Sequence, residues 1–456
     1  MQFIKEQKGS ALIYVLISAV LMTSTLLVIL NYYHLQQRLV SRKGHLLQAK
    51  YSAEGALYQF LQEIEEKQDF SPLKKSNESV ITISSEDSAR IQSICWGGFL
   101  FLASVTNNRG ENFYLEALAG THPSAAFNPA IMVSPNSGPL ILSGRSRVEG
   151  DVVMGSGGIR KVQLREQEDN RDIPVHGSII ETSQDLRPEI DRNYLENIWE
   201  IFREVIESED LLTFPEILQD TSRYISADSA GNWWEQPIYV TNEQLNQNNW
   251  HLRGPLILIA DGPLLLKNNL IMEHFVQIFS SHTIEVQGQG STFHEVLFYS
   301  PKKIILSGAD NFCGQIFSDQ EILIQDRSRL HYPTLLTVKS KSDSGLIRIN
   351  ASCTAAGSII LVSENYPFVG AQNQSKIFIE EGAVVDGLVW SDNYTQLQGE
   401  VNGLVITNQF YEYDPPTLYR NWIKNGIVRR KKLNRRFCLP LFFKQTGSYL
   451  TVLDIQ

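Results

Sequence analysis

A twelve-residue pattern that recurs in the second half of the chain constrains the fold more than any other feature. The stretches LSGRSRVEGDVV (Leu142–Val153) and LSGADNFCGQIF (Leu306–Phe317) share Leu-Ser-Gly, three residues, an apolar residue, one residue, Gly, one residue and two apolar residues. INASCTAAGSII (Ile349–Ile360) and IEEGAVVDGLVW (Ile379–Trp390) fit the pattern, and TQLQGEVNGLVI (Thr395–Ile406) fits it loosely. The later copies are separated by roughly one, two or three units of about 15 residues, as expected of stacked coils.

The aligned glycines are predicted to form the corners of a solenoid. They are Gly150, Gly314, Gly357, Gly387 and Gly403. Glycine permits a backbone with positive φ and a close approach between stacked coils. Short β-rich runs such as GPLILIA, HEVLFYS and EILIQD lie between the copies. The predicted fold class is therefore mainly β, a parallel β-helix or solenoid over residues 251–412 with its first coils in 128–159. A β-sandwich, which also has short strands and frequent turns, is the alternative.

A resemblance to bactofilins rests on the motifs VEGDV and VVDGLVW. Bactofilins are polymer-forming β-helical proteins, and the similarity covers only a few coils. It implies a second hypothesis for this chain, a scaffold that faces the cytoplasm.

The amino-terminal region contains a long apolar run, Ala11–Leu30, with no charged residue from Ser10 to Gln37. About 20 helical residues at 1.5 Å each span a hydrocarbon layer of roughly 30 Å. The run is longer than the apolar core of a secretory signal, and Tyr32 and Tyr33 suit a membrane interface. We therefore expect a retained transmembrane helix over 10–36 that contacts the lipid bilayer through Ala11–Leu30.

The first 65 residues resemble the amino terminus of type IV pilin-like, minor-pilin assembly proteins. The leader MQFIKEQKG precedes SALIYVLISAV, and AKYSAEGAL follows the anchor. The resemblance implies a leader over 1–9 processed between Gly9 and Ser10, and a helix that continues over 37–70. Major pilins carry a glutamate at the fifth mature position, where this chain has Tyr14, which argues against a major fibre subunit. Some minor pseudopilins also lack that glutamate.

The two signals for membrane orientation disagree. Lys5 and Lys8 precede the apolar run, whereas four basic residues soon follow it, which favours a cytoplasmic position for the downstream part. A pilin-like leader implies the opposite. We favour a single-pass cell-membrane protein of a bacterium with an extracytoplasmic carboxyl-terminal domain.

Three further segments are predicted. Residues 78–120 alternate in polarity and predict a small antiparallel β head. Residues 160–250 predict a Trp-rich helical insertion, with an amphipathic helix after Pro188 and with Trp233, Trp234 and Trp250 as either packing residues or a sugar platform. Residues 413–456 predict a basic tail, in which RRKKLNRR is either a solvated run or a contact for anionic lipid or an acidic partner.

The sequence contains no strong catalytic or metal-binding motif. HExxH, P-loop, GxSxG and paired-cysteine motifs are absent, and the four cysteines are widely spaced. A net charge of −10 argues against general nucleic-acid binding. His274 and His282 are not expected to be metal ligands. We expect no enzyme activity, catalytic residue, cofactor or metal. The expected role is structural, in assembly or adhesion, with other pilin-like subunits or surface polysaccharide as partners.

An enzyme acting on carbohydrate remains the third hypothesis, because solenoids can place acidic and basic residues along one face. Its candidates are Asp310, Asp326, Arg327, Arg329 and Asp343, which fall in predicted turns.

Overall fold

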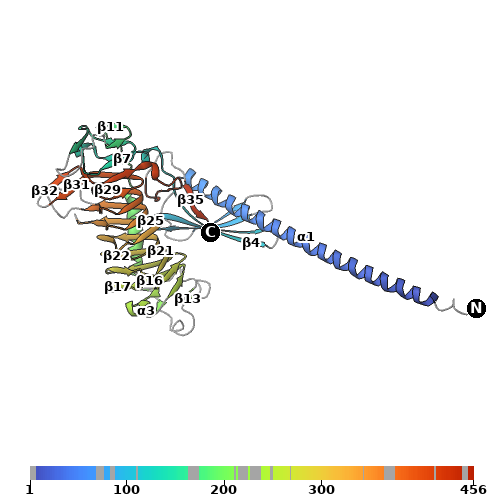
Figure 1. Cartoon of the computed structure of the whole chain (residues 1–456). Coiled ribbons are helices and arrows are strands. Elements are labelled where there is room, and N and C mark those ends of the chain that lie inside the picture. Colours follow the sequence, from blue (N-terminus) through green and yellow to red (C-terminus); the bar gives the residue numbers. More distant parts are fainter. Residues whose placement is uncertain are drawn as a thin grey trace, which may run out of the picture.

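The computed structural model describes residues 7–67, 77–82, 88–108, 111–162, 174–209, 212–213, 224–225, 238–246, 250–267, 269–341, 344–363, 375–414, 417–443 and 450–455. Figure 1 shows a long helix that projects from a small antiparallel sheet, and a tall stack of parallel strands beside that sheet.

Helix α1 (Gln7–Lys67) is continuous over 61 residues. Its second half packs on the head sheet, which has the antiparallel order β1-β2-β3-β4-β35. The strands are β1 (Asn77–Thr82), β2 (Ser88–Trp96), β3 (Phe99–Asn108), β4 (Glu111–Thr121) and β35 (Leu450–Ile455). Small and apolar residues of α1, including Ala53, Ala56 and Leu57, are fully or almost fully buried against the sheet. The predicted head over 78–120 is therefore four strands of a five-stranded sheet.

The second unit is a parallel β-solenoid with three faces. Face 1 contains β12 (Leu212–Thr213), β14 (Ile238–Tyr239), β16 (Leu256–Ala260), β19 (Val276–Ser280), the second parts of β21 (Thr292–Ser300), β23 (Asn311–Ser318), β25 (Arg329–Ser340) and β27 (Thr354–Ser363), then the middle of β29 (Val384–Leu397), β31 (Leu404–Asp414), β5 (Ile131–Val133), β8 (Val152–Met154) and β11 (Ile179–Glu181).

Faces 2 and 3 complete each coil. Face 2 contains β17 (Leu264–Leu266), β20 (Ile284–Gln287), β22 (Lys303–Ser307), β24 (Glu321–Gln325), β26 (Leu346–Ile349), β28 (Lys376–Ile379), β33 (Trp422–Lys424), β6 (Leu140–Ser143) and β9 (Ile159–Val162). Face 3 contains β13 (Tyr224–Ile225), β15 (His251–Arg253), β18 (Ile271–Glu273), the first parts of β21, β23, β25, β27 and β29, β30 (Glu400–Val401), β34 (Ile427–Arg429), β7 (Arg147–Glu149) and β10 (Val175–His176). The hairpin strand β32 (Thr417–Arg420) pairs with β31, and short helices are α3 (Asn242–Asn246), η1 (Ala125–Phe127), η2 (Pro135–Ser137) and η5 (Arg430–Lys432).

Alternation of side chains along the strands builds the solenoid core. In β22 (Lys303–Ser307), Ile304 and Leu306 are fully buried, whereas Lys303, Ile305 and Ser307 are half-buried on the outside. Because successive residues of a strand point to opposite sides, each coil contributes one apolar row to a common interior. A single coil cannot bury its apolar row alone, so the coils are stable only when they are stacked.

The coils are stacked in an order that differs from their order in the sequence. The first coils, predicted over 128–159, lie on the last ones, because β5 pairs with β31 and β7 pairs with β34. They continue through β9, β10 and β11, inside the predicted insertion. The chain then crosses to the opposite end of the stack and builds the remaining coils back toward β31. The predicted insertion therefore combines three end strands, a crossover helix and the opposite end of the stack.

Helix α2 (Arg192–Ile206) makes the crossover along the outside of face 1. Its start lies beside β29, where Arg192 binds Asp392 at 2.9 Å. Its end lies beside β19, where the rings of Phe202 and Phe279 are 5.6 Å apart. Fifteen residues at 1.5 Å each give about 22 Å, close to five strand spacings of about 4.8 Å. Between β19 and β29, face 1 is thus buried on both sides, and its strands there have almost continuous apolar sequence.

Candidate interaction sites

The first half of α1 exposes an apolar surface. The segment Ala11–Glu66 contains a window with mean hydropathy 2.5, none of which is buried within the protein. The hydroxyls of Ser18 and Thr23 donate to the helix's own carbonyls, so they do not prevent burial in lipid. This helix has the length and composition to cross a membrane. Gly9 and Ser10 lie within α1, and residues 1–6 of the predicted leader lie outside the described residues.

All five predicted corner glycines lie in one column, at the corner where face 3 turns into face 1. Gly357 pairs with Gly387 in neighbouring coils, and Gly314 pairs with Val296. A Cβ added to Gly403 would lie 1.9 Å from the Gly387 oxygen, and one added to Gly387 would lie 1.8 Å from the Gly357 oxygen. Glycine is required in the column because the backbone of each coil occupies the space that a Cβ atom of the next coil would need. We call these stacked residues the glycine column.

Gly150 extends the column into the first coils. Its φ is +137°, and an added Cβ would lie 2.9 Å from the Ala130 Cβ and 2.8 Å from the Arg430 Cβ. Gly177 continues it, because an added Cβ there would lie 2.2 Å from the Gly150 oxygen. The sequence pattern did not identify Gly177, which lies outside any copy of the template.

Two coils place non-glycine residues with positive φ at this corner. His274 and Phe275 have φ values of +56° and +62°, and Glu295 has a φ of +55°. Non-glycine residues rarely adopt this conformation, and it costs about 1–3 kcal/mol for each. The head sheet approaches here, since Phe101 of β3 packs its ring 4.2 Å from that of Phe275. Contact with the head therefore stabilises the strained corner.

Titratable side chains gather at the same corner. The Nδ1 atom of His274 lies 3.7 Å from Glu295 and 3.9 Å from Glu116 of β4. Burial, together with Arg253, lowers the pKa of His274, so the imidazole is mostly neutral near pH 7. Among the described residues, no three or more His, Cys, Asp or Glu side chains form a group that could hold a metal ion. His282 lies on another corner, where its backbone N–H donates to Ser280.

The predicted basic tail is folded against the solenoid and the head. Strands β33 and β34 pair with β6 and β7, and β35 completes the head sheet. Residues 430–437, which we call the basic strap, follow the outside of the glycine column. Arg430 lies against Gly150 and donates to the Phe127 carbonyl, and a Cβ on Gly387 would lie 3.1 Å from the Phe437 ring. A solvated run is therefore the wrong description of this backbone.

Apolar residues at the end of the strap and directly after it anchor the strap. Phe437, Leu439, Phe442 and Phe443 are all buried in the cluster that joins face 1, α2 and the head. The Tyr332 hydroxyl donates to the Arg436 carbonyl and accepts from the Cys438 N–H. The run FCLPLFF was the sequence signal for this packing, because a solvated tail rarely carries so many large apolar residues.

The other candidates are dispersed. Trp250 is buried in the solenoid core, and Trp233 and Trp234 lie outside the described residues. Asp326 and Arg327 occupy a turn between β24 and β25, where Asp326 accepts from Ser307. Asp310 is exposed in the preceding coil and Arg329 begins β25; Asp343 lies outside the described residues.

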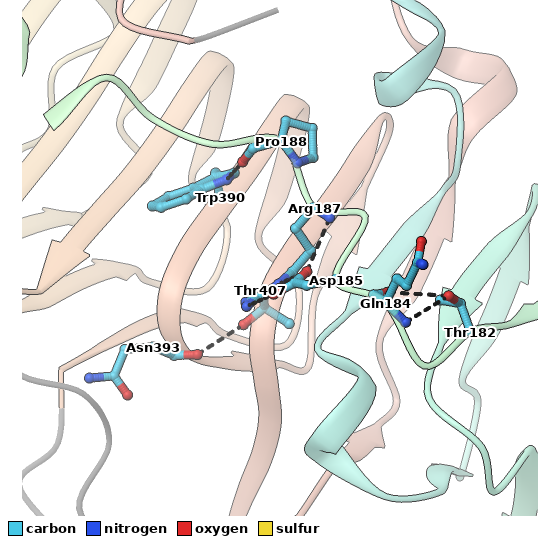
Figure 2. Close-up of polar contacts among 8 residues, drawn as sticks. All are labelled: Thr182, Gln184, Asp185, Arg187, Pro188, Trp390, Asn393 and Thr407. Carbon is cyan, nitrogen blue, oxygen red and sulfur yellow. Dashed lines mark hydrogen bonds and ion pairs between the residues drawn. The ribbon is translucent and has the colours of Figure 1, made fainter.

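The segment that leads into the crossover is fixed by polar contacts. Figure 2 shows Arg187 folded onto Asp185, and the Trp390 indole donating to the Pro188 carbonyl at 3.3 Å. Thr407 bonds to the Asn393 carbonyl in the adjacent coils. The bond from Trp390 fixes the segment before α2 relative to face 1.

No protein-family model and no curated protein sequence matches the chain. Among the solved structures that align with it are two bacterial proteins. One is the competence-associated pilin ComZ from Thermus thermophilus, with 11% identity, a TM-score of 0.24, and coverage of 90% of this chain and 97% of the other. The second is an ice binding protein from an Antarctic bacterium Flavobacteriaceae, with 10% identity, a TM-score of 0.11, and coverage of 67% and 97%. TM-scores this low do not establish a shared fold.

Proposed function

We propose that this chain is a membrane-anchored, pilin-like structural protein that holds a β-solenoid outside the cytoplasm for assembly or adhesion. The observation that carries the proposal is the division of α1 into two halves. One half is apolar and exposed, whereas the other is buried against an antiparallel head sheet. A bilayer covers the first half, and the second half connects it rigidly to the solenoid.

The rigid connection supports a structural role. Gln315 of the solenoid accepts from the Gly98 N–H at 2.8 Å and donates to the Trp96 carbonyl at 2.8 Å, both in the head. The chain also connects the solenoid to the head near its carboxyl end, through the basic strap and β35. A force or displacement at α1 is therefore transmitted to the whole solenoid.

The test determines two properties of the protein produced in its native cell: the residue at which it begins, and the side of the membrane on which the solenoid lies. We expect an intact mass that begins at Ser10, and protease cleavage of the exposed solenoid turns on whole cells. A protein that begins at Met1 and resists protease until the cells are opened would contradict the proposal. That result would favour the cytoplasm-facing scaffold.

A further inference from the structure

The basic strap presents positive charges that the fold does not use. Lys431, Arg435 and Arg436 are exposed, and none makes an ion pair with another described residue. Their neighbours in sequence are used internally, since Arg429 binds Glu400 and Glu149, and Lys432 lies 3.4 Å from Glu400. The free charges are held on a fixed backbone, because the strap is anchored at both ends by Arg430 and Phe437.

A surface of opposite sign lies on the crossover helix. Glu200, Glu204 and Glu207 are exposed at spacings of four and three residues, so they share one side of α2 or its C-terminal cap. The opposite side of α2 is buried on face 1 through Trp199 and Phe202. We call the three glutamates the acidic stripe. Like the strap, the stripe is fixed to the solenoid rather than carried on a loop.

We propose that the basic strap docks on the acidic stripe of a second copy of this chain. The occupant follows from charge complementarity on the chain itself. Each copy carries a net charge of −10, so two copies repel unless opposite local charges meet. The strap is a concentrated positive surface without ion pairs to other described residues, and the stripe is an exposed negative surface. The contact is between different surfaces, so it joins copies head to tail and can continue beyond a dimer.

This inference deepens the proposed assembly role, and its test does not depend on membrane insertion. The full chain is purified in a neutral detergent, and its self-association is measured by sedimentation. Exposed ion pairs are weak individually, so we expect a weak contact that depends on salt. Raising the salt from about 0.1 M to about 1 M shortens the screening distance from about 10 Å to about 3 Å and should weaken association about tenfold or more.

Charge reversal tests the pairing directly. We expect the strap variant (Lys431→Glu, Arg435→Glu, Arg436→Glu) and the stripe variant (Glu200→Lys, Glu207→Lys) each to lose self-association by about tenfold or more. An equal mixture of the two variants should associate again, because each strap then meets a stripe of opposite sign. All five positions are exposed, so both variants should keep the wild-type unfolding temperature. Matched controls are Arg160→Glu and Glu181→Lys, exposed charges on β9 and β11 that should have no effect.

Three outcomes overturn the proposal. They are wild-type association that neither variant changes, no association at all at low salt, and loss in both variants without recovery in the mixture. In the last case the strap binds something else, such as anionic lipid headgroups. A chain that fails the topology test but recovers association in the mixture refutes the membrane orientation and leaves this contact intact.

Discussion

Single residues of the glycine column determine whether adjacent coils can approach. Gly387 has a φ of +154°, and an added Cβ would lie 1.8 Å from the Gly357 oxygen. Gly387→Ala should therefore push two coils apart and lower the free energy of unfolding by about 1–3 kcal/mol or more, the usual cost of overpacking. Denaturant unfolding of the purified chain measures this change. Gly262→Ala is the matched control, because nothing lies within 4 Å of its added Cβ. Equal effects of the two substitutions would contradict the stacking role of the column.

A second single residue, the buried carboxyl of Asp392, makes the stability of the fold depend on pH. Burial raises the pKa of Asp392 from 3.8 to about 6, despite the Ser363 N–H and Arg192 that bind it. The folded state then binds more protons than the unfolded state between about pH 4 and 6, so the contribution of Asp392 to stability falls as the pH rises through this range. A shift of about two units corresponds to about 2–3 kcal/mol. Asp392→Asn should remove this fall, as measured by unfolding at pH 4, 5, 6 and 7. A variant with an unchanged pH profile would show that Asp392 does not titrate differently on folding.

Among the elements, α2 is the one whose packing face the sequence predicted best. The amphipathic pattern after Pro188 places eight apolar residues on one side: Ile190, Tyr194, Leu195, Ile198, Trp199, Phe202, Val205 and Ile206. The first six are buried, and Val205 and Ile206 are partly buried against the same cluster. Phe202→Ala should cost about 3–5 kcal/mol, the usual range for a buried Phe, and should release α2 from face 1. Hydrogen exchange over 192–206 should then become faster than in the wild type. Glu200→Ala, on the exposed side, should leave the exchange unchanged. Similar exchange in both variants would mean that α2 is held by its ends alone.

The sequence predicts the individual coils but not the order in which they pair. Alternation of polar and apolar residues and the glycine template identified the coils, because each is a local pattern of a single strand or corner. Nothing local shows that β5 pairs with β31, since any open strand edge of this solenoid offers similar backbone partners. The sequence left the role of the strap open for a related reason, since a basic run is ambiguous until its apolar neighbours are placed. The non-glycine corners at His274 and Glu295 were missed because the head that stabilises them is distant in sequence.

For the whole molecule, the fold predicts that head and solenoid unfold together. Gln315 is fully buried, and its amide satisfies both the Gly98 N–H and the Trp96 carbonyl. Gln315→Leu keeps the size of the side chain but leaves both backbone groups buried without a partner, at about 1–3 kcal/mol for each. We expect calorimetry to record one transition for the wild type, and for Gln315→Leu an earlier transition of the head separated from that of the solenoid. Gln320→Leu, an exposed position on the next turn, should keep the single transition. One transition at the wild-type temperature in Gln315→Leu would mean that the strap and β35 alone couple the two units, so that a load applied to α1 reaches the solenoid through the carboxyl-terminal chain rather than through the interface.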